Sequence, residues 1–249
     1  MLKGKTAVVT GGSRGIGKAI CLKFAENGAD IAFLYAGNTV KAEETVKELE
    51  GLGVKAKAYQ CNVADADAVA AVIKEIVKDF GGIQILVNNA GITKDKLVPM
   101  MKAADFDAVI DTNLKGAFYM TKGVYPLFLK QKGGKIINIA SMLSFQGGIR
   151  VPSYTASKSG VMGVTRLMAN EWAKHNINVN AIAPGYMATN NTQQLRADEQ
   201  RSAEILDRIP AGRWGLPSDL MGPVVFLASS ASDYVNGYTI AVDGGWLAR

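Results

Sequence analysis

The chain has 249 residues, of which 48% are hydrophobic and 20% charged, and this composition fits a globular protein of one or two domains. Its formal net charge is +6, but Lys and Arg are interleaved with Asp and Glu, which argues against nucleic-acid binding and leaves the attraction of anionic small molecules. Two cysteines and one histidine are too few for a disulfide framework, a zinc site or a histidine-based triad.

The N-terminal residues MLKGKTAVVT contain no long apolar stretch ahead of the first expected strand, so we expect no signal peptide. No apolar run reaches the length that a membrane span needs. These features predict a soluble, cytoplasmic protein that binds neither a membrane nor a nucleic acid and holds no metal.

Short runs rich in β-branched residues alternate with amphipathic helical stretches, which is typical of a parallel sheet covered by helices. The expected strands, in chain order, are Thr6–Thr10, Asp30–Tyr35, Val54–Cys61, Ile83–Asn88, Lys135–Ala140, Ile177–Ala183 and Tyr238–Val242. The expected helices are Lys18–Asn27, Val40–Leu52, Asp65–Phe80, Phe106–Gln131, Ser153–His175 and a last one toward Ser229. We therefore predict one α/β domain over residues 1–249, a Rossmann-type doubly wound parallel seven-stranded sheet with helices on both faces. The polar segment 190–208 is interpreted as a lid over a cleft.

A glycine-rich loop, Gly11-Gly12-Ser13-Arg14-Gly15-Ile16-Gly17, follows the first expected strand and opens the first expected helix. Glycines let the backbone turn tightly and approach a pyrophosphate, whose charge is met by N–H groups at the helix N-terminus. Such loops also occur as plain turns, but the strand–loop–helix context favours a nucleotide cofactor.

The end of the second expected strand reads Tyr35-Ala36-Gly37-Asn38, where NAD-binding folds usually carry an Asp or Glu that binds the ribose hydroxyls. Nothing in this segment repels a 2′-phosphate, and Arg14 could pair with one. The sequence therefore favours NADP(H) and leaves NAD(H) as the alternative. The less specific interpretation makes Arg14 a solvated loop residue.

Tyr154 and Lys158 occupy positions i and i+4 of an expected helix, and Ser141 precedes Tyr154 by 13 positions. On a helix the two side chains share a face, where an ammonium stabilises a tyrosinate and lowers its pKa. A phenol tuned in this way exchanges a proton with an alcohol or ketone oxygen. A core tyrosine beside a surface lysine is the alternative, but Ser141 and the glycine loop favour a catalytic set.

With these motifs, and with Asn88-Asn-Ala-Gly91, Asn113 and Pro184-Gly185, the chain resembles the short-chain dehydrogenase/reductases over essentially its whole length. The resemblance implies hydride transfer between a nicotinamide and a secondary alcohol or ketone. It implies the catalytic residues Asn113, Ser141, Tyr154 and Lys158, with Asn113 holding a water linked to Lys158. The implied cofactor-binding residues are Gly11, Ser13, Arg14, Gly15, Ile16, Gly17, Tyr35, Asn38, Asn62, Val63, Asn89, Ala90, Gly91, Tyr154, Lys158, Pro184, Gly185, Met187 and Thr189.

The same resemblance implies a homotetramer with two-fold axes. Its interfaces would use the helices Phe106–Gln131 and Ser153–His175 and the strand Tyr238–Val242, with Val161, Val164 and Leu167 in a helix interface.

Different parts of the chain resemble two different subfamilies. Residues 1 to about 133 resemble bacterial 3-oxoacyl-[acyl-carrier-protein] reductases, and the remainder closely resembles 2-dehydro-3-deoxy-D-gluconate 5-dehydrogenases. A chimera joined near Gly134 is our hypothesis, and a natural intermediate sequence is the alternative.

The second half supplies most of the substrate pocket, so we expect a small-molecule substrate, a sugar acid such as 2-dehydro-3-deoxy-D-gluconate. The lid residues Asn190, Asn191, Gln193, Gln194 and Arg196 suit hydroxyls and a carboxylate, although a solvated helix face also explains them. Three alternatives remain: a 3-oxoacyl-thioester reductase, a cofactor-binding regulator without turnover, and a chimera with little activity.

Overall fold

The computed structural model describes residues 1–249 except for the side chain of Asn191. Its core is one sheet of seven parallel strands in the order β3-β2-β1-β4-β5-β6-β7, so the doubly wound sheet predicted from the sequence is confirmed. The strands, in chain order, are β1 Thr6–Thr10, β2 Asp30–Tyr35, β3 Ala56–Gln60, β4 Ile85–Asn88, β5 Gly134–Ile139, β6 Ile177–Pro184 and β7 Thr239–Val242.

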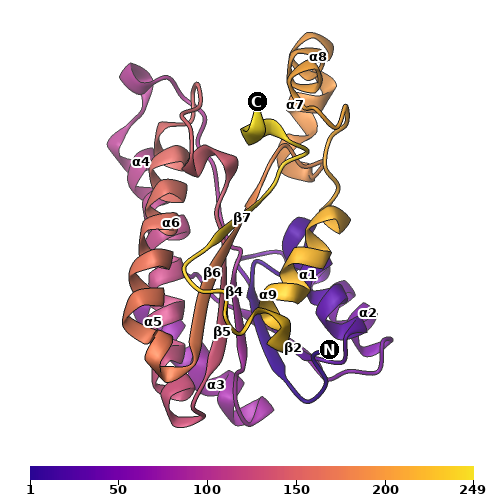
Figure 1. The fold of residues 1–249 in the computed structure, drawn as a ribbon, viewed down its shortest axis with the longest axis vertical. Helices are drawn as coiled ribbons and strands as arrows, with labels where there is room; N and C mark the ends of the chain where they lie inside the picture. The colour runs from indigo at the N-terminus through magenta and orange to yellow at the C-terminus, as the bar shows by residue number, and fades with distance from the viewer.

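Helices cover both faces of this sheet (Figure 1). They are α1 Gly15–Glu26, α2 Thr39–Glu50, α3 Ala66–Phe80, α4 Ala103–Ile110, α5 Gly116–Lys130, α6 Pro152–Trp172, α7 Gln193–Ala197, α8 Glu199–Arg208 and α9 Met221–Ala228. One set of buried side chains joins α1, α2 and α9 to the sheet, and a second set joins α3, α5 and α6 to it.

The order of the strands reverses between β1 and β4, which are hydrogen-bonded neighbours. In open α/β sheets, ligands bind in the crevice outside the carboxyl ends of the strands at such a reversal. The predicted lid segment folds into a short 3-10 turn, Asn190–Thr192, followed by α7 and α8. Both helices and the C-terminus lie at the end of the sheet to which β6 and β7 lead (Figure 1).

The predicted helix Phe106–Gln131 is present, but it contains an irregular turn. A π-helical turn, Asp111–Lys115, separates α4 from α5. Such a turn inserts an extra residue and often marks a functional site. Here it carries Asn113, which is only 2% exposed. The other expected elements are present with ends displaced by at most three residues.

One of the three residues expected in the subunit interface is buried within the chain. Val161 is 2% exposed and packs within the chain against Ala140, Ala181 and Ala183, so it cannot form a subunit interface. Val164 packs against the core between α3, α5 and α6. Of the three residues, only Leu167, which is 55% exposed, is available for contact with another subunit.

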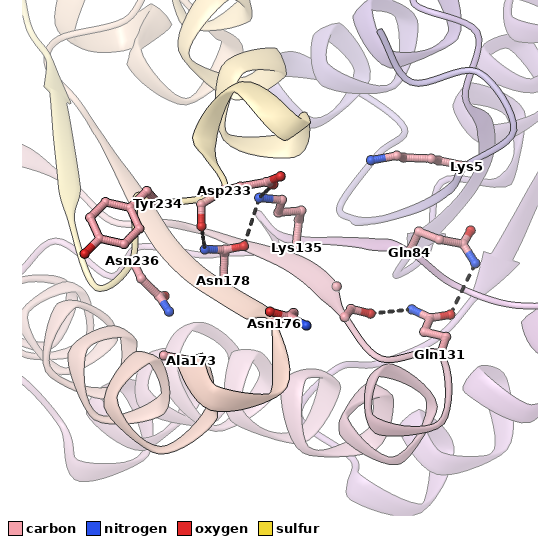
Figure 2. A pocket seen from close by; sticks show the side chains of 12 residues that line it. Lys5, Gln84, Gln131, Lys135, Ala173, Asn176, Asn178, Asp233, Tyr234 and Asn236 are labelled. Atoms are coloured by element: carbon pink, nitrogen blue, oxygen red, sulfur yellow. Dashed lines mark hydrogen bonds and ion pairs between the residues drawn. The ribbon is translucent and has the colours of Figure 1, made fainter.

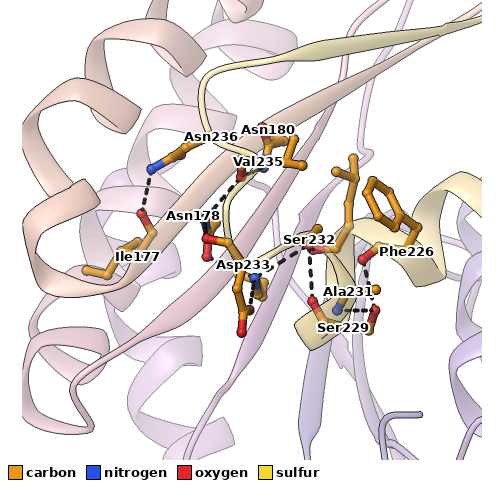
Figure 3. Close-up of polar contacts among 12 residues, drawn as sticks. Ile177, Asn178, Asn180, Phe226, Ser229, Ala231, Ser232, Asp233, Val235 and Asn236 are labelled. Atoms are coloured by element: carbon orange, nitrogen blue, oxygen red, sulfur yellow. Dashed lines mark hydrogen bonds and ion pairs between the residues drawn. The ribbon is translucent and has the colours of Figure 1, made fainter.

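A cavity of about 650 Å³ lies at the amino ends of β5 and β6, away from the carboxyl edge (Figure 2). The buried ammonium of Lys135 donates there to Asn178 Oδ1 (2.8 Å) and Asp233 Oδ1 (2.7 Å). Asn178 Nδ2 and Asn180 Nδ2 donate to backbone carbonyls of the segment before β7 (Figure 3). These contacts fasten that segment to β6.

No helix of the described residues is both long and apolar enough to cross a membrane. Within the same part of the chain, His, Cys, Asp and Glu side chains form no group of three that could hold a metal ion.

Candidate active site

The three side chains Ser141, Tyr154 and Lys158 meet at the carboxyl edge of the sheet. Ser141 follows β5 in an extended conformation, and its Oγ accepts a hydrogen bond from Leu143 N (3.2 Å), which starts a 3-10 turn. Pro152 opens α6, so Tyr154 and Lys158 lie on its first two turns. Ser141 lies close enough to Tyr154 to lower the pKa of its phenol. The structure thus brings the predicted proton-transfer residue and its orienting serine close together.

Lys158 is 4% exposed, and its ammonium donates to the carbonyl oxygen of Ile139 (2.5 Å). The Nζ atom lies 5.7 Å from the centroid of the Tyr154 ring. Burial lowers the pKa of Lys158 to about 8. A buried ammonium therefore stands beside the tyrosine, as the i and i+4 spacing predicts.

The expected lowering of the Tyr154 pKa is not present in this structure. Burial raises the pKa of Tyr154, the neighbouring Ser141 opposes that shift, and the negative charge of Asp95 adds to it. The physical reason is the direction of Lys158, whose ammonium is bound to the Ile139 carbonyl rather than to the phenol.

Asn113 is fixed by its neighbours on both sides of its amide. Its Oδ1 accepts from Ile92 N (2.8 Å), and its Nδ2 donates to Ile92 O (3.0 Å) and to Ser157 Oγ (3.1 Å). A Cβ at Gly91 would lie 3.3 Å from Asn113 Oδ1 and 3.8 Å from Lys158 Nζ, so these three residues adjoin one another. The water that would link Asn113 to Lys158 stays a prediction.

The glycine loop passes closely over the carboxyl end of β1. Gly15 has a φ of +56°, and a Cβ at Gly17 would lie 2.1 Å from the carbonyl oxygen of Gly11. Asn89 fixes the start of the loop, because its Nδ2 donates to Thr10 O (2.9 Å) and Gly11 O (3.2 Å). Asn89 is therefore a support of the loop in this structure.

The N-terminus of α1 is open toward a ligand. Arg14 precedes the helix in an extended conformation without a side-chain hydrogen bond, and no acidic residue lies in the first turn. The first N–H groups of a helix lack partners within it, and they favour a phosphate. Ser13, Gly15 and Ile16 belong to the same loop and turn, so the predicted pyrophosphate contacts are near one another.

The segment after β2 carries no carboxylate. Ala36, Gly37 and Asn38 are exposed, and Asn38 Oδ1 accepts from Lys41 N (2.9 Å), which caps α2. Asn62 uses its Oδ1 in a similar way, on Ala64 N (3.1 Å). The carbonyl groups of both predicted contact residues are thus engaged locally, which leaves their amide N–H groups for a ligand.

The segment from Pro184 to Thr189 continues β6 toward the lid. A Cβ at Gly185 would lie 2.7 Å from Asp243 Cα, so glycine is required for this approach. Met187 is buried and forms a parallel bridge with Gly215. Thr189 caps the 3-10 turn that leads into α7.

Three functional candidates were missed from the sequence: Gln146, Arg208 and Trp246. Trp246 is buried with Met142, Ile205 and Ile209 in a cluster that joins the C-terminal turn, α8 and the residue after Ser141. An aromatic residue directly after Asp243-Gly-Gly245 was the available signal, but nothing in the sequence relates it to α8.

A family model described as short chain dehydrogenase matches residues 5–200. The chain belongs to this family. It is 64% identical over 249 residues to 2-dehydro-3-deoxy-D-gluconate 5-dehydrogenase of Escherichia coli (strain K12), covering 100% of this chain and 97% of that protein. It is 46% identical over 241 residues to a 3-oxoacyl-[acyl-carrier-protein] reductase of Staphylococcus aureus (strain Mu50 / ATCC 700699), covering 97% of each chain.

Among solved structures, a gluconate 5-dehydrogenase from Burkholderia cenocepacia J2315 in complex with NADP and tartrate superposes with a TM-score of 0.96. Its sequence identity to this chain is 37%, and the alignment covers 100% of this chain and 97% of that one. The chain is therefore similar to short-chain dehydrogenases in both its sequence and its fold.

Proposed function

We propose that the protein is an NADP(H)-dependent oxidoreductase that interconverts a secondary alcohol and a ketone of a sugar acid such as 2-dehydro-3-deoxy-D-gluconate. The observation that carries this proposal is the contact between Tyr154 and Ser141 beside buried Lys158, at the edge where the glycine loop also lies. The 64% identity to a 2-dehydro-3-deoxy-D-gluconate 5-dehydrogenase supports the substrate class. We also propose that residues 1–249 form one domain with α7 and α8 as its lid.

The residues around the carboxyl edge fit a dinucleotide. The uncapped N-terminus of α1 suits a pyrophosphate. Because Gly17 has no side chain, the loop backbone can come close to that pyrophosphate. Lys158 and Tyr154 would hold the ribose, and Pro184, Gly185, Met187 and Thr189 would line the nicotinamide. Bound there, the nicotinamide supplies or accepts the hydride.

The proton is moved by this chain's own residues. In ketone reduction, the Tyr154 hydroxyl donates its proton to the substrate oxygen, and in alcohol oxidation it takes that proton back. Ser141 orients the same oxygen through its hydroxyl, which already adjoins that of Tyr154. The Lys158 ammonium stabilises negative charge on the phenol oxygen once it turns from the Ile139 carbonyl.

Cofactor choice follows from the exposed segment after β2. Arg14 has no ion-pair partner among the described residues, and Tyr35–Asn38 contains no carboxylate. A 2′-phosphate therefore meets a free guanidinium and no repelling group. NADP in the related gluconate 5-dehydrogenase structure is consistent with this choice.

A 3-oxoacyl-thioester reductase is the rival enzyme. The identity to such a reductase is 46%, against 64% for the sugar-acid enzyme, and Asn170–His175 lacks an arginine for gripping an acyl carrier. The junction near Gly134 stays a prediction, and full-length identity to one enzyme does not require it. A cofactor-binding regulator without turnover does not explain why Ser141 and Lys158 both lie close to Tyr154.

Initial rates with a panel of substrates test the proposed function. Keto and hydroxy sugar acids, neutral ketones and a 3-oxoacyl thioester are each supplied with NADPH or NADH, or their oxidised forms, and absorbance of the reduced nicotinamide is followed. We expect the highest kcat/KM for a sugar acid with the phosphorylated cofactor. A higher kcat/KM for the acyl thioester would assign the rival function.

We expect a homotetramer in solution. Phe118 and Leu129 on α5 and Leu167 on α6 are 42%, 38% and 55% exposed, and apolar area of this kind is ordinarily covered by a symmetric partner. Light scattering at micromolar concentration is expected to give four times the chain mass. A monomer mass would contradict the assembly, and Leu167→Glu should dissociate it without unfolding the chain.

The buried charge of Lys158 predicts how stability depends on pH. Its pKa is about 8 when folded, against 10.5 for an exposed lysine, so between these values the unfolded chain binds more protons. The free energy of unfolding contributed by this group therefore rises with pH across that window. Urea unfolding from about pH 7 to about pH 10 should show the wild type gaining stability relative to Lys158→Met. A difference that stays constant with pH would contradict the lowered pKa.

A further inference from the structure

Helix α8 and the C-terminal turn pack directly on the residue that follows Ser141. Ile205 of α8, Ile209 directly after it, Trp246 of the turn and Met142 are 4–5% exposed and form one cluster. The segment after β5 that begins at Met142 continues to Gln146 and then to Tyr154. This cluster therefore places α8 and the C-terminal turn beside the residue that follows Ser141.

Arg208, the last residue of α8, lies beside this cluster. Its guanidinium carbon is 4.0 Å from the centroid of the Trp246 ring, and its Nη2 donates to Gln146 Oε1 (3.3 Å). A guanidinium has five N–H donors, so most of those on Arg208 remain free. The aromatic ring and the carboxamide hold the cation in place without neutralising it.

Other arginines near the lid differ from Arg208 in their partners. Arg201 forms an ion pair with Glu204 (3.5 Å), and Arg213 forms one with Asp219 (2.7 Å). Arg196 donates to the backbone oxygen of Thr189 (3.2 Å). Arg208 has no carboxylate partner among the described residues, so its charge is available for an anion.

Two further donors belong to the same group. The Trp246 indole N–H is buried and has no hydrogen-bond partner among the described residues. Gln146 uses its oxygen on Arg208, which turns its N–H₂ group into a free donor. A buried donor without a partner costs free energy, and a guanidinium fork matches the two oxygens of a carboxylate. The accessible donors are those of Arg208 and Gln146, and a ligand with a negatively charged acceptor would satisfy them.

We propose that Arg208, positioned by Trp246 and Gln146, binds the carboxylate of the substrate and gives the enzyme its preference for sugar acids over neutral polyols. This inference rests on the proposed function, because it places the acid end of that substrate. Ser141 and Tyr154 hold the reacting oxygen at one end, and Arg208 holds the carboxylate at the other. It also replaces Arg196 as the expected carboxylate contact.

The test compares a sugar acid with its primary amide, which keeps the shape and loses the charge. Arg208→Gln should raise KM for the acid about 100-fold and leave kcat/KM for the amide unchanged, so the preference for the acid is lost. Arg208→Lys, which keeps a cation, should retain part of the preference. Lys78→Gln, which removes one exposed charge on α3, should retain all of it. NADPH affinity measured by nicotinamide fluorescence should be the same in every variant, which shows that the cofactor site is intact.

Two results would overturn this inference in different ways. If the wild type reduces sugar acids and Arg208→Gln keeps the same acid-to-amide ratio, the carboxylate site is not at Arg208. Loss of the ratio in Arg196→Gln, with Arg208→Gln unaffected, would move the site to α7. A wild-type enzyme without turnover of any sugar acid would instead reject the proposed function itself.

Discussion

Replacing Tyr154 by Phe is expected to lower kcat for the sugar acid by about 10²–10⁴-fold, the contribution of a positioned general acid. The variant loses only the hydroxyl that adjoins Ser141, so the ring still packs at the start of α6. Cofactor affinity should fall far less than kcat, because Lys158, the glycine loop and the α1 N-terminus still bind the dinucleotide. Initial rates at saturating cofactor, together with a fluorescence titration of NADPH, measure both quantities.

Tyr234→Phe is the matched control for this substitution. Tyr234 is fully exposed on the segment before β7, so removing its hydroxyl should leave the rate at the wild-type value. A Tyr154→Phe enzyme that kept even a tenth of the wild-type kcat would remove Tyr154 from proton transfer.

Ala36→Asp is expected to reverse the cofactor preference from NADP(H) to NAD(H). Ala36 is exposed just beyond β2, beside the N-terminus of α2, where a carboxylate accepts ribose hydroxyls and repels a 2′-phosphate. Like charges that face each other cost several kcal/mol, so the affinity for NADPH should fall about 100-fold, or ~3 kcal/mol. Dissociation constants for NADPH and NADH from nicotinamide fluorescence measure the change.

Ala36→Asn separates the effect of charge from that of size. It adds nearly the same volume at the same exposed position, so it should keep the wild-type preference for NADPH. Tighter binding of NADH than of NADPH by the wild type would show that the segment after β2 does not select the phosphate.

The fold was predictable because each local pattern agreed with the sheet. Both ends of β2, Asp30–Tyr35, were predicted correctly. Its apolar run lies between two glycine-containing segments, and such a run is typical of a buried strand. The predicted helix Asp65–Phe80 begins at Asp65, which caps α3: its Oδ1 accepts from Asp67 N (2.9 Å) and Ala68 N (3.0 Å). Both features are local, and local features are what sequence patterns encode.

The parts that were missed depend on distant residues. The π turn at Asn113 contains neither glycine nor proline, and its stabilising bonds go to Ile92, 21 positions away. The direction of Lys158 is set by a carbonyl on β5, which helix spacing does not reveal. The contact between Arg208 and Gln146 joins positions 62 residues apart, so no pattern along the chain predicts it.

The most direct test of hydride transfer to a sugar-acid carbonyl uses NADPH that carries deuterium at both C4 positions of the nicotinamide. The keto acid is reduced by the wild type, and the product is examined by mass spectrometry and NMR. We predict one deuterium per product molecule, bound to the new carbinol carbon, and no reduced product with heat-denatured enzyme. Product without deuterium, or deuterium at another carbon, would contradict the function proposed for Ser141, Tyr154 and Lys158.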